Sequence, residues 1–230
     1  MNKVKTLLIT VCILLIASSV ILTIYVNYQK QRAQDHSKLP AKVENNKGFQ
    51  KWVTNLKNKS LDVSADDFKL KEENEIYNTK WMKIFSYDND DIKKVFEETL
   101  KNNPEAKQVV YSPSKRQFID YRAAVRGDYL PNEARYYGLR DEKILDARIL
   151  DCSTKANCYF DRAYFLDNDV FVISEFSRDV DKNIVTEECL STALCEYTVK
   201  VHVIDLNNNK RYVYESHPLT IVLANIISEL

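Results

Sequence analysis

Residues Lys143–Ser216 have the sequence KILDARILDCSTKANCYFDRAYFLDNDVFVISEFSRDVDKNIVTEECLSTALCEYTVKVHVIDLNNNKRYVYES, and this stretch decides the fold. It holds four of the five cysteines, in two pairs with five residues between the members of each pair. Each pair lies between two runs that are typical of β-strands, so a chain that doubles back brings its two cysteines together. Four cysteines in two equal spacings indicate an oxidising compartment, where disulfides persist.

We expect the local disulfides Cys152–Cys158 and Cys189–Cys195, because each pair brackets a strand-to-strand connection. Three connectivities are possible for four cysteines, and the crossed ones require two hairpin tips to touch. Zinc is the competing chemistry, but structural zinc sites usually space their cysteines by about two to four residues. The pattern favours disulfides and no metal.

The strands of this stretch are predicted from alternation and from β-branched and aromatic residues. Alternation is clearest in 197–203, where Tyr197 and three valines alternate with Thr198, Lys200 and His202, which indicates one buried and one outward face. The other strand-like runs are Ile144–Asp151, Tyr159–Leu166, Val170–Ser177, the short Asn183–Glu187 and Lys210–Glu215. Their connections are too short for crossovers, so an antiparallel meander is expected. Leu219–Ile227 is apolar and predicts a last strand, with a helix as the alternative.

Composition excludes several classes of protein. Lys+Arg and Asp+Glu are equal at 33 each, so no net field draws the chain to nucleic acid. Only three glycines are present, which excludes a glycine-rich phosphate-binding loop. We therefore expect no nucleic-acid partner and no nucleotide cofactor.

Leu7–Val26 is a run without charged residues that is long enough for a helix to cross a bilayer. Lys3 and Lys5 precede it, as in a secretory leader. We expect an uncleaved transmembrane anchor in contact with membrane lipid, with cleavage after Ser19 as the alternative. Residues 1–6 are then cytoplasmic and the bulk of the chain lies outside the plasma (inner) membrane, because the cysteine pairs require an oxidising side.

Residues 27–47 carry five basic and two acidic side chains and too few apolar ones to fold alone, so we expect a flexible basic tether. Residues 48–230 form one predicted α+β domain, whose Cys-rich sheet covers 143–216. Phe49, Trp52, Val53 and Leu56 make an amphipathic helix stripe that packs on this domain, and a second helical stripe covers 92–100. A β-hairpin is predicted from Lys107–Tyr111 and Gln117–Arg122.

The turn of this hairpin, Tyr111-Ser112-Pro113-Ser114-Lys115, resembles the blade turn of secreted β-propellers. The resemblance covers about a dozen residues, lacks the usual Asp-Gly, and has no second copy at a period of about 40–45 residues. A β-propeller-like fragment is thus the alternative fold.

The segment 122–140 has no clear periodicity, and we expect a long connection there. It concentrates the two residue types that dominate interface hot spots. We therefore predict a binding surface for a protein or cell-envelope component, or else a loop that covers one end of the sheet. The candidate residues are Arg122, Arg126, Tyr129, Arg135, Tyr136, Tyr137 and Arg140.

No motif for catalysis is present: neither HExxH, G-x-S-x-G, a Walker loop nor CxxC occurs, and the three histidines have no helical spacing. Asp161, Glu175 and Asp179 lie along the predicted sheet, where carboxylates from distant positions can meet as in glycosidases. We expect a membrane-anchored, extracytoplasmic, non-catalytic interaction module of the cell envelope, without cofactor. An exported carboxylate-dependent hydrolase and a sensor ectodomain are the alternatives.

Overall fold

The computed structural model describes six ranges of the chain: 16–23, 47–76, 82–102, 108–122, 132–181 and 189–227. By their contacts, residues 1–37 and 38–230 form two separate units. Each unit is described by itself.

In the first unit, residues 16–23 are helical and their apolar side chains are exposed. The rest of the predicted anchor Leu7–Val26, and the predicted tether up to residue 46, lie outside the described residues. Within the described ranges, no helix combines the length and the apolar character that crossing a membrane requires.

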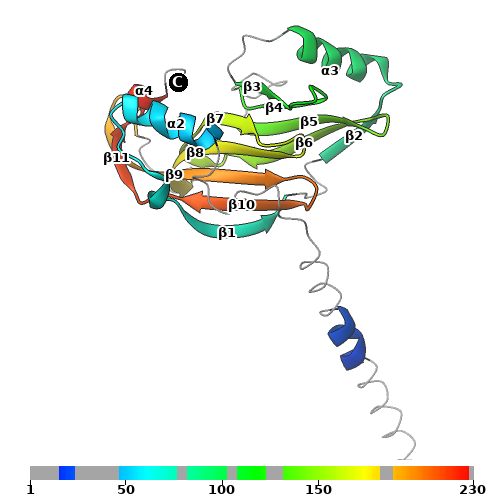
Figure 1. Cartoon of the computed structure of the whole chain (residues 1–230), viewed down its shortest axis with the longest axis horizontal. Helices are drawn as coiled ribbons and strands as arrows, with labels where there is room; N and C mark the ends of the chain where they lie inside the picture. Colours follow the sequence, from blue (N-terminus) through cyan, green and yellow to red (C-terminus); the bar gives the residue numbers. More distant parts are fainter. Residues whose placement is uncertain are drawn as a thin grey trace, which may run out of the picture. The chain divides into compact units, whose positions relative to one another are not determined.

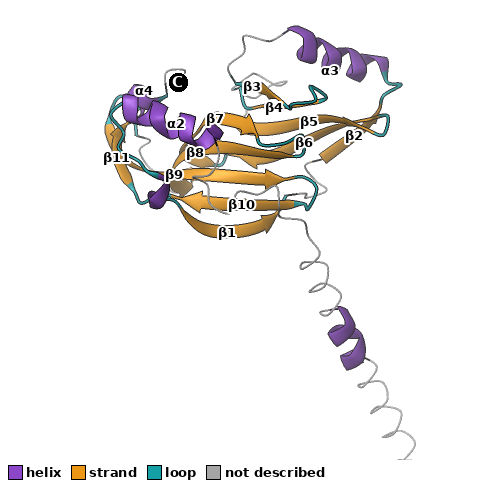
Figure 2. Ribbon diagram, in the orientation of Figure 1, coloured by secondary structure: helices purple, strands orange, loops and turns teal. Residues whose placement is uncertain are grey.

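The second unit contains two antiparallel sheets (Figure 1). The first has the strand order β1-β10-β9-β8-β7, with β11 paired to β9, and the second has the order β2-β6-β5-β4-β3. Figure 2 distinguishes the strands from the helices. The strands are β1 Lys69–Glu75, β2 Met82–Ser86, β3 Val109–Tyr111, β4 Gln117–Asp120, β5 Glu133–Arg140, β6 Lys143–Asp151, β7 Lys155–Phe165, β8 Val170–Asp181, β9 Leu194–Asp205, β10 Lys210–Glu215 and β11 Leu219–Val222. The helices are α2 Lys47–Asn58, the short η2 Ala65–Asp67, α3 Asp90–Asn102 and α4 Leu223–Ile226.

Three clusters of buried side chains show how these elements form layers. In one cluster Tyr136 and Ile149 of the second sheet pack against Phe171 and Ile204 of the first, so the two sheets lie face to face. A second cluster lies on the other face of the first sheet, beneath α2 and α4. A third joins Phe96 of α3 to the other face of the second sheet. The central strands β8 and β9 of the first sheet are therefore buried on both faces.

The predicted helix stripes are confirmed. Phe49, Trp52 and Leu56 of α2 are buried in the core, because residues three and four apart share one helix face. The second stripe is α3, whose first turn carries Asp90 and Asp91, next to the positive end of the helix dipole. The Asn89 carboxamide oxygen accepts a hydrogen bond from the Ile92 N–H (3.2 Å) and satisfies one of the free donors of this turn.

The mainly antiparallel character and the predicted hairpin, now β3 and β4, are also confirmed. The single meander is not, because the chain passes from the second sheet to the first between β6 and β7. The apolar segment 219–227 combines both predicted forms: β11 extends the β10 edge of β9, and α4 follows directly. Residues 183–187, predicted as a short strand, lie outside the described residues.

Candidate functional site

The structure places much of the Tyr/Arg segment within a strand. Residues 133–140 form β5, between β4 and β6, so the expectation of a connection without regular structure is wrong for this half. Arg126 and Tyr129 lie outside the described residues, as does the side chain of Arg140. Burial alternates along β5, with Tyr136 buried and Tyr137 half-buried. A two-residue alternation of this kind is the signal that indicates a strand.

The two arginines of this segment whose side chains the structure describes bind carboxylates of their own domain. The Arg122 guanidinium donates through Nε and Nη2 to Asp120 (2.9 and 2.8 Å). Arg135 donates to Asp146 (2.6 Å) and to Glu133 (2.9 Å). Burial by itself would lower the pKa of Arg135, but Asp146 and Glu133 raise it above its ordinary value. The guanidinium N–H groups that would bind a partner therefore already bind carboxylates within the domain.

The two described tyrosines among the candidates, Tyr136 and Tyr137, contribute to the cores. Tyr136 lies parallel to Phe171 across the two sheets, with ring centroids 6.4 Å apart. Tyr137 stacks on Phe118 at 4.8 Å, in the core beside α3. The described part of the segment thus provides no exposed Tyr/Arg patch, and a binding role for it stays a prediction.

A different surface presents apolar side chains to solvent. We call residues 189–195 the cystine loop, because the Cys189–Cys195 disulfide closes it. Leu190 and Leu194 within it are 71% and 68% exposed. Leu70 and Ile84 are the other large apolar side chains that are exposed among the described residues of the domain, and they lie on β1 and β2. The cystine loop therefore concentrates apolar surface in one short segment.

The cystine loop is held in one conformation by bonds to the folded domain. The Asn157 carboxamide donates to the Cys189 carbonyl (2.7 Å) and accepts from the Cys189 N–H (2.9 Å). The Ala193 N–H donates to the Leu190 carbonyl, and the Ala224 N–H of α4 donates to the Ser191 carbonyl, both at 2.9 Å. The two leucines are thus carried on a preorganised loop, which lowers the entropy cost of binding.

The second cystine lies inside the domain, between the two sheets. Cys152 follows β6 and Cys158 belongs to β7, and their Cα atoms are 5.3 Å apart. Both are buried. With the Cys189–Cys195 bridge, this disulfide confirms the predicted local pairing.

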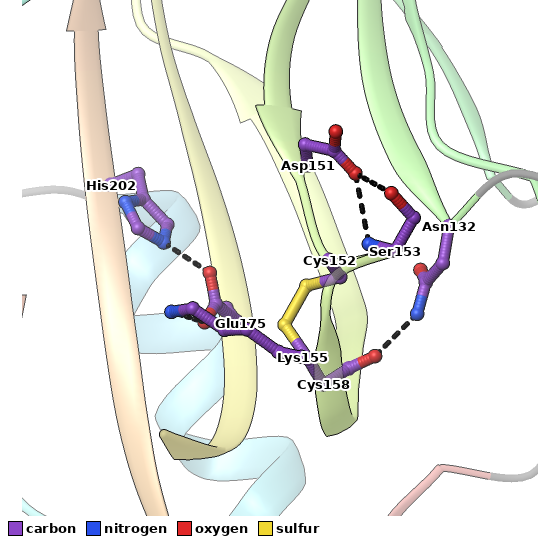
Figure 3. Close-up of a disulfide and its surroundings, with 8 residues drawn as sticks. All are labelled: Asn132, Asp151, Cys152, Ser153, Lys155, Cys158, Glu175 and His202. Carbon is purple, nitrogen blue, oxygen red and sulfur yellow. Dashed lines mark hydrogen bonds and ion pairs between the residues drawn. A yellow bond between two sulfur atoms is a disulfide. The ribbon is translucent and has the colours of Figure 1, made fainter. Parts of the chain in front are cut away.

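Two buried ionisable groups, Glu175 and His202, lie near this cystine, and the partly exposed Lys155 lies beside them (Figure 3). A carboxylate oxygen of Glu175 and the two sulfur atoms lie within 4.8 Å of one another. Glu175 Oε2 is 2.8 Å from His202 Nε2, and Glu175 Oε1 is 3.7 Å from Lys155 Nζ. Burial alone would raise the pKa of Glu175, but His202, Lys155 and Lys200 lower it to about 2. The carboxylate is therefore charged in the folded domain at neutral pH.

His202 was expected on the outward face of its strand, and this expectation is wrong. Tyr197, Val199, Val201 and Val203 are buried, as predicted, in the cluster beneath α2, but the alternating face of β9 contacts the second sheet. His202 is 4% exposed for this reason. A buried polar side chain requires a partner, and Glu175 of the neighbouring strand β8 provides it.

Of the predicted sheet carboxylates, Asp161 and Glu175 do not meet. Asp161 accepts a hydrogen bond from Trp52 Nε1 (2.6 Å), so it lies on the α2 face of the first sheet, whereas Glu175 faces the second sheet. Burial raises the pKa of Asp161, and the Trp52 hydrogen bond lowers it in part. The side chain of Asp179 lies outside the described residues. A hydrolase that uses Asp161 with Glu175 has no support in this arrangement.

A polar cleft of about 450 Å³ lies where β10 passes into β11. His217 Nδ1 is 3.6 Å from Asp67 there. The Ser64 N–H donates to Asp67 and lowers the pKa of this carboxyl, which thereby serves the turn of η2. The cleft is lined by Asp66, Asp67, Lys69, Lys71, Thr198, Glu215, Ser216, His217 and Pro218. Its charges are of both signs, so they indicate no particular ligand.

The chain matches no known protein-family model and has no significant match among curated proteins or solved structures. Function must therefore be argued from the site itself.

Proposed function

We propose that the folded domain is a non-catalytic interaction module that binds a partner protein through the cystine loop. The observation that carries this proposal is the pair of exposed leucines, Leu190 and Leu194, on a loop closed by a disulfide. A rigid apolar projection of this kind fits the anchor role in a protein interface, where a side chain fills a pocket and loses its water. The cystine loop takes the place of the Tyr/Arg segment as the leading surface.

The partner is a protein with an apolar pocket and not an anionic membrane surface. Between the two cysteines the cystine loop contains Leu190, Ser191, Thr192, Ala193 and Leu194, and no Lys or Arg. Attachment to anionic lipid draws on basic side chains next to the apolar ones. The bridge also indicates that the partner lies in the same oxidising compartment.

Substituting both leucines, Leu190→Ser with Leu194→Ser, is expected to weaken the complex at least about 100-fold. Each leucine that a partner buries contributes about 1.5–3 kcal/mol, and a factor of ten corresponds to about 1.4 kcal/mol. A photocrosslinking amino acid at Thr192, which is exposed between the leucines, reports contact in intact cells. We expect one discrete protein adduct in the parent chain and none in the double variant.

The matched control is Leu70→Ser with Ile84→Ser, which removes two exposed apolar side chains from the edge strands β1 and β2. The adduct at Thr192 should persist in this control. Adducts confined to lipid, no adduct in the parent chain, or equal yields in both double variants would contradict the proposal.

We further propose that this module is tethered to the plasma membrane by Leu7–Val26, with residues 1–6 in the cytoplasm. The two disulfides support the oxidising side for the domain. A protease added to sealed cells or spheroplasts is expected to remove the domain, and the same treatment should spare a cytoplasmic marker protein. Full protection of the domain, with digestion only after lysis, would show that this topology is wrong.

A further inference from the structure

We propose that, when its thiols are free, the chain binds a divalent ion such as Zn²⁺ through Cys152, Cys158 and Glu175, and that the disulfide closes this site. Thiolates with an oxygen donor are a ligand set that Zn²⁺ accepts. The role is separate from partner binding by the cystine loop, because the two sites share no residue.

The three donors already lie close together, although the two bonded sulfurs must separate before they can share a metal. With bonds of about 2.3 Å to sulfur and 2.1 Å to oxygen, the ligands of a tetrahedral Zn²⁺ are about 3.6–3.8 Å apart. A carboxylate oxygen of Glu175 and the two sulfurs lie within 4.8 Å of one another. Breaking the S–S bond lets the sulfurs separate, so small side-chain rotations suffice.

Backbone contacts hold the two cysteines independently of their bridge. The Cys152 N–H donates to the Asn132 carbonyl (2.7 Å), and the Cys152 carbonyl accepts from the Lys155 N–H (3.1 Å). Cys158 is paired with Ser177 in the ladder between β7 and β8, and its carbonyl accepts from the Asn132 carboxamide. Reduction therefore leaves the two side chains facing the same point.

Glu175 supplies a buried oxygen that has capacity for an ion. Its Oε2 interacts with His202, whereas its Oε1 is buried without a hydrogen-bond partner. Lys155 Nζ is 3.7 Å from Oε1, which is too long for a hydrogen bond, and the Lys155 side chain is 36% exposed. A buried carboxylate that has one oxygen without a hydrogen-bond partner, and an oxygen within 4.8 Å of both sulfurs, is what distinguishes this pair. Among the described residues, Cys189 and Cys195 have no such third donor.

Closing the site is a two-electron oxidation. The Cys152 and Cys158 thiolates form their S–S bond while the S–S bond of a disulfide acceptor breaks. The acceptor takes both electrons and leaves as two thiolates, and the metal ion is released. Reduction by a dithiol reverses each of these changes, and the ion can bind again.

Cobalt tests the proposal, because Co²⁺ replaces Zn²⁺ and gives an intense thiolate-to-metal absorption band. The full-length chain is unfolded and its disulfides are reduced with a phosphine. After the phosphine has been removed, the chain is refolded without oxygen in the presence of Co²⁺. We expect one Co²⁺ per chain with the band, and neither in the oxidised chain. Glu175→Gln should lower the Co²⁺ affinity at least about tenfold. Changing a residue that only hydrogen-bonds to a metal ligand usually costs about 10–100-fold, and a direct ligand should matter at least as much.

The two cysteine pairs serve as matched variants, and Cys12 is present in all of the chains. Cys189→Ala with Cys195→Ala should keep the band, whereas Cys152→Ala with Cys158→Ala should lose it. Far-UV circular dichroism in the presence of Zn²⁺ reports whether the ion restores the fold of the reduced chain. Absence of the band in the reduced parent chain, whether folded or not, or its dependence on Cys189 and Cys195, would overturn the proposal.

Discussion

His202→Leu is expected to destabilise the domain by about 3–5 kcal/mol at pH 7, the usual cost of leaving a buried charge without its partner. Glu175 and His202 are each 4% exposed, and their side chains are 2.8 Å apart between the two sheets. Without His202, the charged carboxylate loses its nearest partner in a site that water does not reach. Urea unfolding followed by far-UV circular dichroism measures the loss.

The effect of this pair depends on pH with a definite sign. The folded domain lowers the pKa of Glu175 from 4.5 to about 2. Because the pKa of Glu175 is lower in the folded than in the unfolded chain, its charged form stabilises the fold. This contribution is complete above pH 4.5 and is lost as the pH falls toward 2. The difference in unfolding free energy between wild type and His202→Leu should therefore shrink over that window.

Two further variants separate this explanation from general damage to the core. Replacing both partners, Glu175→Leu with His202→Leu, should recover much of the loss, because no unpaired charge remains. His217→Leu is the matched control: this histidine is exposed and lies 3.6 Å from Asp67, so we expect less than about 1 kcal/mol. A double variant as unstable as the sum of its single variants, or a deficit that is constant with pH, would contradict the role assigned to the pair.

The parts of the fold that could be predicted from the sequence rest on local periodicity. Phe49, Trp52 and Leu56 recur at helical spacing, and α2 forms there with these side chains buried. The short spacing between Cys152 and Cys158 in the sequence limits how far apart they can lie, so their disulfide could be predicted. Both inferences concern residues that are near one another in the chain.

The sheet order and the buried polar site could not be predicted, because they depend on contacts between distant segments. Polar residues that alternate with valines predict a solvent-exposed face, yet His202 is covered by a second sheet whose strands precede it in the chain. Arg135 suggested a binding surface, but Asp146 of the neighbouring strand β6 neutralises it across the ladder. In both cases a partner from another strand reverses the interpretation of a single residue.

Trp52→Ala is expected to cost about 3–5 kcal/mol, the range found for truncating a buried aromatic side chain. Trp52 is 1% exposed, and its ring packs against Phe49 and Phe68 at centroid distances of 5.7 and 5.9 Å. It also joins α2 to β7, because Nε1 donates to Asp161 Oδ2 (2.6 Å). The variant loses the packing and this hydrogen bond together, and urea unfolding measures the total.

Trp52→Phe limits the packing loss, because the variant keeps a smaller aromatic ring in α2, and it removes the N–H; the pH dependence then reports the hydrogen bond. Leaving a buried acceptor without its donor costs about 1–3 kcal/mol. Burial already raises the pKa of Asp161 and the Trp52 bond opposes this, so the pKa rises further in the variant. A folded pKa above the unfolded one destabilises the charged form, so the deficit relative to wild type must shrink as the pH falls through that pKa. A deficit that does not change with pH would mean that ring volume alone, and not the bond to Asp161, fixes α2 to the sheet.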